Sequence, residues 1–329
     1  MSFKVAVVGV GHLGRHHARL WARQPGVELV AVVDRDKGRA KEVAEPLGAK
    51  AFTDLKDLPE GIQAASVAVP TEAHLKTASL LLERGIPVLV EKPMTPTAAD
   101  AEALVALARR KGLHLQPGFV ERFNPAIRAA SGILGKPRFI EAVRVAPLKF
   151  RSLDIGVVMD LMIHDLDIVL WLAGSEVTRI EALGVNVLTN AEDVANARLH
   201  FANGCVADLT ASRVSQKTVR EIRVFQEDAY LSIDYGEKRV KVCRKKGDPP
   251  RNPLLLAGLL AAAGGDPKAL MAKYLEIQDL PIQEEEPLEA EIRAFLATVR
   301  DGEPPVVTGQ AALEALRVAE RIRAEMRTK

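Results

Sequence analysis

The sequence predicts an α/β protein: a doubly wound parallel sheet at the N-terminus, followed by an α+β domain with a large, mostly antiparallel sheet. Three observations predict this class. A glycine-rich turn follows the first apolar strand. Strands and helices then alternate up to about residue 116, which is the pattern of parallel β-α-β units. Beyond residue 138, short strand-like runs follow one another, and Asn203-Gly204 between two of them is a strong hairpin signal.

The first stretch, KVAVVGVGHLGRHHARLWA, combines a strand, a turn and a helix. Val5–Val8 is the apolar, β-branched run of a buried parallel strand. The turn that follows is Gly9-Val10-Gly11-His12-Leu13-Gly14, with the spacing G-x-G-x-x-G. In such a turn the first glycine permits the tight bend, the second lets a pyrophosphate approach the backbone, and the third lets the helix pack on the strand. Because the helix N-terminus offers free N–H groups, the stretch predicts a dinucleotide site.

A carboxylate stands where the adenosine ribose of a dinucleotide would bind. The second strand-like run, Val27–Val33, leads into Asp34, 20 residues after Gly14. A carboxylate there accepts the ribose hydroxyls and repels a 2′-phosphate, so we expect NAD as the cofactor. The neighbouring Arg35 leaves NADP open, because an arginine can accommodate that phosphate.

Further strands and helices complete the predicted parallel sheet. The predicted strands cover residues 51–53, 65–69, 88–90 and 113–116, and the predicted helices cover residues 37–47, 71–84 and 97–110. Ligands of such sheets bind beyond the carboxyl ends of the strands. We expect five positions at these strand ends: Gly9, Asp34, Pro70-Thr71, Lys92 and Gln116. Together they predict one binding edge.

The pattern changes near residue 121, so we predict domains over residues 1–122 and 123–329. A helix through Ser131 links the two halves. The predicted strands of the second half cover residues 138–145, 178–187, 195–201, 206–212, 219–225, 229–234 and 239–244, and a helix covers residues 157–172. We expect this sheet to have helices on one face only. Residues 248–286 are predicted only as a long connection with a helical piece, and helices near 288–300 and 309–327 end the chain.

Composition excludes several classes of protein. The chain has 329 residues, of which 48% are hydrophobic, and its net charge of +2 gives no argument for a nucleic-acid or membrane surface. Its two cysteines lie far apart, which favours free thiols in a reducing compartment. The later apolar run at 254–263 is about half of the ~20 residues that a membrane span needs, and the N-terminus shows no signal peptide. We therefore expect a cytoplasmic protein.

Lys92 directly follows a buried-type strand and precedes Pro93. At a strand end beside the predicted cofactor site, an ammonium group can donate to the oxygen of a substrate hydroxyl or carbonyl, and its charge lowers the pKa of that hydroxyl. Lysines at strand ends are also common in ordinary surface loops. The residues alone leave both interpretations open.

A second group of candidate catalytic residues lies in the segment Asp160-Leu-Met-Ile-His164-Asp165-Leu-Asp167. On a regular helix, Asp160, His164 and Asp167 share one face. An imidazole beside a carboxylate is a usual general base, oriented by its neighbour. An ordinary surface ion pair is the alternative interpretation.

No metal site is predicted. Asp160, His164 and Asp167 offer suitable ligand atoms, but no second histidine stands nearby in the sequence. The other histidine group, at positions 12, 16 and 17, lies where the cofactor helix must begin.

Cationic and polar side chains form a third group: Arg122, Asn124, Arg144, Lys149 and Arg151. Arginines at these places can bind a phosphate or a carboxylate through two hydrogen bonds. A solvated rim is the alternative, above all for Arg144 and Lys149.

With these residues in view, the chain resembles the Gfo/Idh/MocA family of nicotinamide-dependent sugar and cyclitol dehydrogenases over nearly its whole length. The motifs that carry the resemblance are VVGVGHLGRHHA, VPTEAH, VEKPMT, MDLMIHDLDIVLWLAG and VTGQAALEALRVAERI. The resemblance implies a dinucleotide domain and a substrate-binding domain. The open sheet face of the second domain would mediate homodimers or homotetramers.

The resemblance also implies roles for particular residues. Lys92 and His164 correspond to the catalytic lysine and histidine of the family, and Asp160 to the aspartate of the same motif. Pro70, Thr71, His74 and Glu91 would lie along the cofactor. Lys92, Arg122, Asn124, Arg151, Asp160 and His164 are the predicted substrate-binding residues.

Within the family, the segments VERFNPA and FRSLDIGVVMDLMIHDLD resemble UDP-N-acetylglucosamine 3-dehydrogenases, which oxidise a nucleotide-sugar hydroxyl to a ketone. We therefore expect NAD-dependent oxidation of a secondary hydroxyl of a sugar, with a nucleotide sugar favoured. The alternatives are an inositol or free-sugar dehydrogenase and, from another class, a dinucleotide-binding regulator without turnover. Intact Lys92, Asp160 and His164 argue against the regulator.

Overall fold

The computed structural model describes residues 2–148 and 155–327, and its contacts divide the chain into two units. The first unit contains Met1–Phe123 and Glu285–Ala324, and the second contains Asn124–Glu284 and Glu325–Lys329. The sequence placed the first boundary at residue 122. It also assigned everything after that boundary to one domain, whereas in the structure residues 285–324 return to the first unit.

A six-stranded parallel sheet in the order β3-β2-β1-β4-β5-β6 forms the centre of the first unit. Its strands are β1 (Phe3–Val8), β2 (Val27–Val33), β3 (Lys50–Phe52), β4 (Ala64–Val67), β5 (Val88–Glu91) and β6 (Leu115–Gly118). The strand order reverses direction between β1 and β4, so the predicted doubly wound sheet is confirmed. One predicted position differs: Gln116 lies inside β6 and is buried, not at a strand end.

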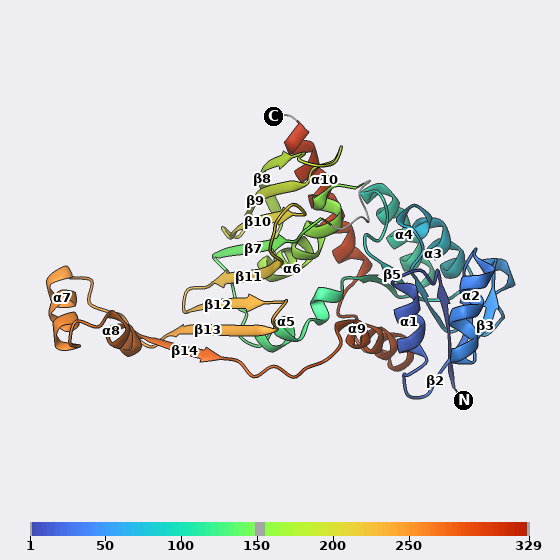
Figure 1. The fold of residues 1–329 in the computed structure, drawn as a ribbon, viewed down its shortest axis with the longest axis horizontal. Helices are drawn as coiled ribbons and strands as arrows, with labels where there is room; N and C mark the ends of the chain where they lie inside the picture. The colour runs from blue at the N-terminus through green and yellow to red at the C-terminus, as the bar shows by residue number, and fades with distance from the viewer. Residues whose placement is uncertain (1, 149–154, 328–329) are drawn as a thin grey trace. The chain divides into compact units, whose positions relative to one another are not determined.

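Helices cover both faces of this sheet (Figure 1). The helices are α1 (Gly14–Trp21), α2 (Lys37–Ala44), α3 (His74–Glu83), α4 (Ala98–Lys111), α9 (Pro287–Leu296) and α10 (Gly309–Arg327). Short helical turns lie at Glu45–Leu47, Leu55–Asp57, Thr71–Ala73, Val120–Phe123 and Ala297–Asp301. Helix α1 packs against α2 and α9, and α3 packs against α4. The chain runs from β1 outward to β3 and then returns to β4 on the other side of β1.

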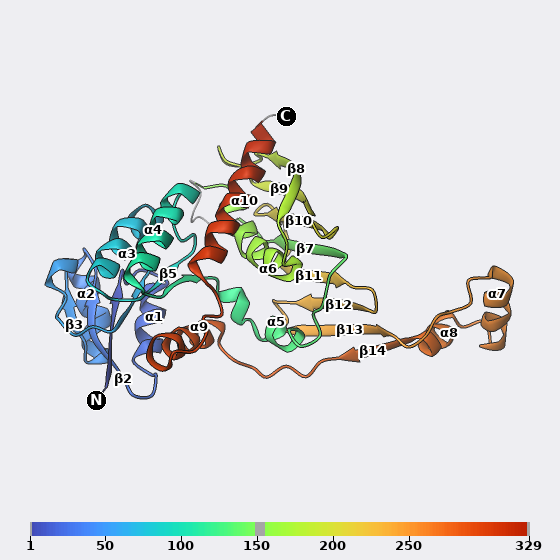
Figure 2. The ribbon, with the colours of Figure 1, turned by 180° about the vertical axis from the view of Figure 1, so that it is seen from behind.

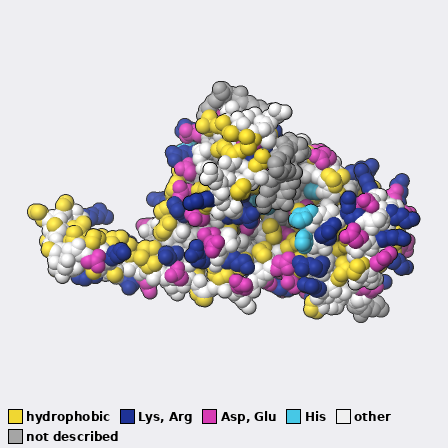
Figure 3. Space-filling model, viewed as in Figure 1, with side chains coloured by type: hydrophobic (Ala, Val, Ile, Leu, Met, Phe, Trp, Pro, Cys, Tyr) yellow, Lys and Arg dark blue, Asp and Glu magenta, His cyan; other side chains and the backbone are white. Residues whose placement is uncertain are grey.

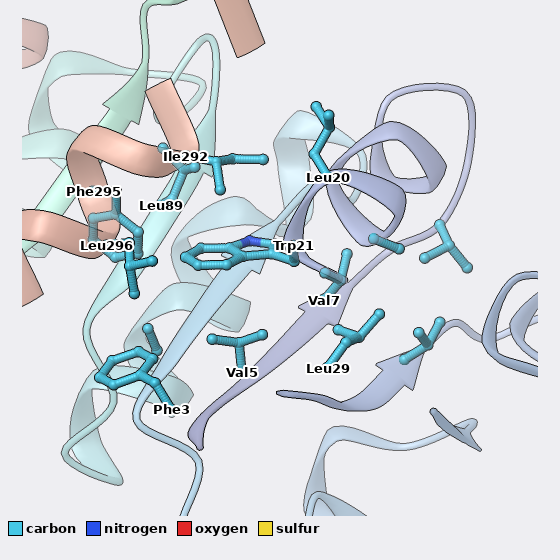
Figure 4. Close-up of a cluster of buried hydrophobic side chains, with 14 of the residues drawn as sticks. Phe3, Val5, Val7, Leu20, Trp21, Leu29, Leu89, Ile292, Phe295 and Leu296 are labelled. Atoms are coloured by element: carbon cyan, nitrogen blue, oxygen red, sulfur yellow. The ribbon is translucent and has the colours of Figure 1, made fainter. Parts of the chain in front are cut away.

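The core of the first unit explains why the end of the chain returns to it (Figure 4). Trp21 of α1 is fully buried, and its ring meets that of Phe295 edge to face at 6.3 Å. Ile292 and Leu296 of α9 join the same cluster, beside Val5 of β1. The apolar side of α9 therefore supplies part of the core on which the glycine-turn helix rests.

An eight-stranded sheet in the order β14-β13-β12-β11-β7-β10-β9-β8 forms the second unit. Its strands are β7 (Phe139–Val145), β8 (Val177–Val185), β9 (Val194–Phe201), β10 (Val206–Ser212), β11 (Val219–Phe225), β12 (Ala229–Asp234), β13 (Arg239–Lys245) and β14 (Leu275–Asp279). Only β7 and β10 pair in parallel; the other neighbours are antiparallel. The predicted mostly antiparallel sheet is confirmed.

Burial alternates along the strands of this sheet. In β7 the buried residues are Ile140, Ala142 and Arg144, and α6 (Ile163–Ala173) packs on β7 and β10. Helix α5 (Pro125–Ala130) packs on β12 and β13. The opposite, open face carries a cluster of tilted rings at one end of β7, β11 and β12: Phe225 lies 5.5 Å from Phe139 and 4.8 Å from Tyr230 between ring centroids.

Residues 248–286 contain more structure than the sequence predicted. Helices α7 (Pro253–Ala262) and α8 (Pro267–Tyr274) follow β13, and β14 then returns to the sheet edge. Figures 1 and 2 show the two helices beyond the end of the β13–β14 pair. Among the described residues no single helix is long and apolar enough to span a membrane; α7 and α8, bent by 111°, meet that test only as a pair.

Candidate active site

The glycine turn has the geometry of a pyrophosphate cradle. Gly9 has φ +83°, and a Cβ there would lie 2.7 Å from the backbone of Ala68. A Cβ on Gly14 would lie 1.8 Å from the carbonyl oxygen of Gly9, so helix and strand pack too closely for a side chain. At Gly11 a Cβ would meet nothing within 4 Å, which leaves room above the backbone. These three environments match the turn, approach and packing roles of a dinucleotide fingerprint, and His12 and Leu13 are exposed between them.

Asp34 is held beside this turn. Its carboxylate accepts hydrogen bonds from the backbone N–H of Val10 at 2.9 Å and of Asp36 at 2.9 Å. The Arg39 guanidinium lies 3.6 Å from the same carboxylate, and Arg35 is exposed. Arg39, a second cation near the ribose position, was not predicted, because it comes one turn into the following helix. The residues present fit NAD at this edge.

A buried chain of hydrogen bonds connects the glycine-turn helix to the end of β5. Trp21 Nε1 donates to Ser66 Oγ at 2.8 Å, and His17 Nδ1 lies 3.1 Å from the same hydroxyl. His17 Nε2 lies 2.8 Å from Glu91 Oε1, and His17 and Ser66 are fully buried. A neutral His17 satisfies every contact when Ser66 donates to Nδ1 and Nε2–H donates to Glu91.

The Glu91 carboxylate in turn holds the backbone of Lys92. Its second oxygen accepts the N–H of Lys92 at 3.2 Å. Burial alone would raise the pKa of Glu91, but hydrogen bonds from His17 and Lys92 outweigh it, so the pKa lies below its usual value. Lys92 itself is half-buried. The sequence could not reveal this support, because His17 and Glu91 are 74 residues apart.

Pro70, Thr71 and His74 follow β4. Pro70 is exposed and Thr71 half-buried, whereas the ring of His74 is 1% exposed. The two ring nitrogens of His74 lie 2.9 Å from the carbonyl oxygen of Pro93 and 2.8 Å from that of Val69. Burial lowers the pKa of His74, although both carbonyl groups favour the charged ring. His74 therefore ties together the loops after β4 and β5.

In the second unit, Asp160 and His164 lie at the start of α6. The first turn, Val158–Met162, is a π-turn and not the α-helical turn that the spacing predicted. Such turns occur frequently at functional sites. Asp160 and His164 are half-buried, but Asp167 is only 2% exposed. Asp167, which was predicted on the same helix face as Asp160 and His164, is thus much less accessible than either of them.

Arg144 and Asp165 form a buried pair that the sequence did not predict. The guanidinium donates from Nε to Asp165 Oδ2 at 2.7 Å and from a second nitrogen to Oδ1 at 2.9 Å. Both residues are less than 5% exposed, and the guanidinium lies 5.6 Å from the ring centroid of Tyr235. The solvated-rim interpretation of Arg144 is wrong. The pair fixes the residue next to His164 to the sheet beneath it.

A second buried pair holds the segment just before the π-turn. Asp193 accepts hydrogen bonds from the backbone N–H groups of residues 187, 188 and 189, and Arg213 Nε donates to its other oxygen at 2.7 Å. Arg213 also donates to the carbonyl oxygen of Ile155 at 2.8 Å. The N–H of Val157 donates to the carbonyl oxygen of Glu192 at 3.0 Å. The loop after β8 thereby sets where the π-turn begins.

Of the remaining predicted site residues, the structure describes Arg122 and Asn124. Arg122 is 8% exposed in the turn Val120–Phe123. Asn124 caps α5: its side-chain oxygen accepts the N–H of Ala126 at 3.0 Å, and its amide donates to the carbonyl oxygen of Tyr235 at 3.4 Å. Arg151 and Lys149 lie outside the described residues.

Metal-binding geometry is not found in the described part of the chain: it contains no group of three or more His, Cys, Asp or Glu side chains placed to hold an ion. The fold and the glycine turn instead define a dinucleotide-binding enzyme domain, and the comparisons with known proteins specify it.

Residues 3–119 match the oxidoreductase family with an NAD-binding Rossmann fold, and residues 128–232 match the C-terminal domain of the GFO/IDH/MocA proteins. The chain belongs to the Gfo/Idh/MocA family. It is an NAD-binding oxidoreductase.

Similar proteins include a UDP-N-acetylglucosamine 3-dehydrogenase of Acidithiobacillus ferrooxidans, 41% identical over 71% of this chain and 75% of that protein. The NAD-dependent scyllo-inositol 2-dehydrogenase of Bacillus subtilis is 33% identical over 64% of this chain and 68% of that protein. Among solved structures, the Acidithiobacillus ferrooxidans enzyme GnnA superposes with a TM-score of 0.88 at 34% identity, covering 100% of this chain and 98% of that chain.

Proposed function

We propose that this oxidoreductase uses NAD to oxidise the C3 hydroxyl of UDP-N-acetylglucosamine. The likeness to the Acidithiobacillus ferrooxidans enzyme in sequence and over the full fold supports this substrate. The observation that carries the reaction class is the position of Lys92. It directly follows β5, at the same carboxyl edge of the parallel sheet as Gly9 and Asp34.

The proposed roles follow from the chemistry of each side chain. NAD, when bound, supplies the acceptor for the hydride that leaves the substrate carbon. The Lys92 ammonium donates a hydrogen bond to the reacting oxygen and stabilises the charge that develops on it. His164 accepts the hydroxyl proton, and Asp160 orients the sugar or the imidazole. Glu91 and His17 keep the backbone at Lys92 in place.

The NAD site is proposed at Gly9, Gly11, His12, Leu13 and Gly14, with Asp34 on the adenosine ribose. Arg35 and Arg39 lie on the solvent side of that carboxylate and weaken its discrimination against NADP. Pro70, Thr71, His74 and Glu91 complete the wall of the site. His74 and Glu91 act through the loops that they hold, because both are buried.

The anionic end of the substrate is assigned to arginines. A diphosphate offers paired acceptors that suit a guanidinium, whereas a neutral sugar does not. We assign this role to Arg122 and Arg151. We expect Arg151→Ala to raise the Michaelis constant for the nucleotide sugar with a smaller change in turnover, which is the pattern of lost uniform binding. Asn124 contributes mainly by capping α5.

The test of the reaction is product analysis. The protein is incubated with NAD and UDP-N-acetylglucosamine, reduced nicotinamide is followed by absorbance, and the sugar product is examined by mass spectrometry. We expect a nucleotide sugar that has lost two hydrogens. Reduction with scyllo-inositol but not with the nucleotide sugar would favour the polyol reaction of the Bacillus subtilis relative. NAD binding without reduction by any substrate would favour a regulator.

We also propose an oligomeric state for the protein. We assign the open face of the eight-stranded sheet to a homodimer or homotetramer interface, because half-buried aromatic rings of β7, β11 and β12 cluster on it. A cytoplasmic location stays a prediction.

A further inference from the structure

Arg144 and Asp165 are charged residues in the interior of the second unit. Figure 3 shows Lys, Arg, Asp and Glu side chains over the surface of the molecule, whereas Arg144 and Asp165 are only 4% and 3% exposed. Removing two charges from water costs about as much free energy as their pairing returns, so apolar residues of similar size are often equally stable in such a place. Stability alone therefore does not explain this pair.

The pair connects the helix that carries His164 to the middle of the sheet. Arg144 belongs to β7, which lies between β11 and β10, and Asp165 is the third residue of α6. Helix α6 packs on β7 and β10 (Figures 1 and 2). Because Asp165 directly follows His164, a contact that fixes Asp165 also fixes where the backbone of His164 lies.

The rest of α6 does not fix this position equally well. Its other buried residues are mostly apolar, among them Leu166 and Val169, and apolar burial has no directional preference. The turn before α6, Val158–Met162, is a π-turn, which holds one residue more than an α-helical turn. One residue corresponds to about 100° of rotation about the helix axis. Conversion of the π-turn to an α-helical turn would therefore rotate His164 away from its present direction.

Directional contacts hold the segment on both sides of the π-turn. Before it, Arg213 donates to the carbonyl oxygen of Ile155 at 2.8 Å. After it, Arg144 donates two hydrogen bonds to Asp165, at 2.7 and 2.9 Å. A guanidinium and a carboxylate that meet in this way accept little rotation or sliding, since both bonds must keep their geometry. His164 therefore lies between two fixed points.

Tyr235 holds the guanidinium from a second side. The guanidinium carbon of Arg144 lies 5.6 Å from the ring centroid of Tyr235, which is 4% exposed, and this distance allows a cation–π interaction. The backbone of Tyr235 is fixed in turn. Its N–H donates to the carbonyl oxygen of Arg220 at 2.8 Å, and its carbonyl oxygen accepts from the amide of Asn124 at 3.4 Å. Arg144 is thus oriented toward Asp165 by its own surroundings.

We propose that the Arg144–Asp165 pair fixes the rotation and the position of α6 on the sheet, and thereby positions His164 to accept the substrate proton. Arg144 and Asp165 are positioning residues, because they act through His164. This inference rests on the proposed function, in which His164 is the base.

Two variants separate the geometry of the pair from its charge and its stability. Arg144→Lys keeps the positive charge but lacks the fork of donors that binds both carboxylate oxygens. The double variant Arg144→Met, Asp165→Leu replaces both charges by apolar side chains, so neither charge is left buried without a partner, and urea denaturation should show near-parent stability. In both variants we expect kcat for UDP-N-acetylglucosamine to fall by about 10²-fold, the loss that a ~1 Å misplacement can cause, with little change in KM and NAD affinity.

The matched control is Arg300–Asp301, an exposed pair of the first unit that also makes two hydrogen bonds, both at 2.9 Å. The same substitutions there, Arg300→Met and Asp301→Leu, should leave kcat unchanged, because the two side chains are 41% and 45% exposed. A stable double variant at Arg144 and Asp165 with the parent kcat would show that the pair serves the fold alone, and this result overturns the proposal. If the double variant does not fold, Arg144→Lys decides in the same way.

Nitrogen NMR of isotopically labelled histidine rings tests the position of His164 without a substrate. The His164 signals are identified by their absence in His164→Gln. We expect them to shift or double in Arg144→Lys and in the double variant, while most signals of the other six of the seven histidines stay in place. Unchanged His164 signals in both variants would contradict the proposal. A parent protein without turnover on any sugar would refute the proposed reaction, and the spectra would still report whether the pair fixes His164.

Discussion

At the scale of single residues, Lys92 is the position on which the proposed chemistry depends most. The variant Lys92→Met keeps most of the apolar stem and loses the ammonium group. We expect NAD binding to remain and turnover to fall by about 10²–10⁴, the range for one acid–base or electrostatic group. Steady-state kinetics and calorimetric titration measure the two effects. The exposed Lys76→Met on α3 is the control. Equal turnover in Lys92→Met and the parent would place Lys92 in an ordinary surface loop.

We expect Asp34 to determine the choice between NAD and NADP. Asp34→Ala removes the carboxylate that faces the ribose position and also frees the N–H groups of Val10 and Asp36. We expect weaker NAD binding and a smaller difference between NAD and NADP, which titration calorimetry with both dinucleotides measures. If the parent binds NADP more tightly than NAD, the assignment of NAD as the preferred cofactor fails.

His17 acts on Lys92 through Glu91, so we expect it to behave as a positioning residue. The amide of His17→Gln can replace Nε2–H as the donor to Glu91, whereas His17→Leu cannot. Turnover should therefore fall much further in His17→Leu than in His17→Gln, with NAD affinity similar in both. Equal losses in the two variants, matched by equal losses of stability, would indicate a purely structural role.

Some residues of the candidate site could be predicted from the sequence, and others could not. The glycines and Asp34 could be assigned because their spacing is local and has a known mechanical reason. The partners of His17 could not, because Ser66 and Glu91 are 49 and 74 residues away in the chain. Only the sheet order β1-β4-β5 brings their strands together.

At the scale of elements, the loop after β8 holds the segment before α6, which carries the proposed catalytic residues, and its contribution to stability should depend on pH. Burial alone would raise the pKa of Asp193, but backbone N–H groups and Arg213 outweigh it, and its pKa lies well below the usual value of 3.8. A carboxyl with a lowered native pKa stabilises the fold above the unfolded pKa, and this contribution is lost as the pH falls through the native pKa.

Asp193→Asn should therefore flatten the acid side of the stability profile. We expect the free energy of unfolding in urea to fall between pH 6 and pH 3 in the parent, and to fall less steeply in the variant, which is less stable at pH 6. Some slope should remain, because the pKa of Glu91 is also lowered. Parallel profiles for the two proteins would show that Asp193 does not carry this dependence.

Helices and strands whose hydrophobic residues recur with a clear period were predicted well from the sequence. Elements without such a period were not. The strands of both sheets follow from apolar runs and alternation, with the exception of β14, which was not predicted. The π-turn at Val158–Met162 was missed because its residues also fit an α-helix. Residues 248–274 were left as a connection because α7 is apolar on every side and has no period that identifies a covered face.

At the scale of the whole molecule, the end of the chain completes the first unit. Phe295 is fully buried against Trp21, so we expect Phe295→Ala to lower the free energy of unfolding by about 3–5 kcal/mol. Urea denaturation measures this change, and the loss should also weaken NAD binding, because Trp21 ends the glycine-turn helix. A loss below about 1 kcal/mol would mean that α9 is dispensable for this core.

The most direct test of the central claim compares substrates. The specificity constant kcat/KM is measured with NAD for UDP-N-acetylglucosamine, free N-acetylglucosamine and scyllo-inositol, by the absorbance of reduced nicotinamide. We predict that the nucleotide sugar is oxidised far more efficiently than either of the others, because the arginines assigned to the diphosphate contribute binding that a neutral substrate lacks. Equal or higher efficiency with the free sugar or the inositol would contradict the nucleotide-sugar assignment and leave the dehydrogenase intact.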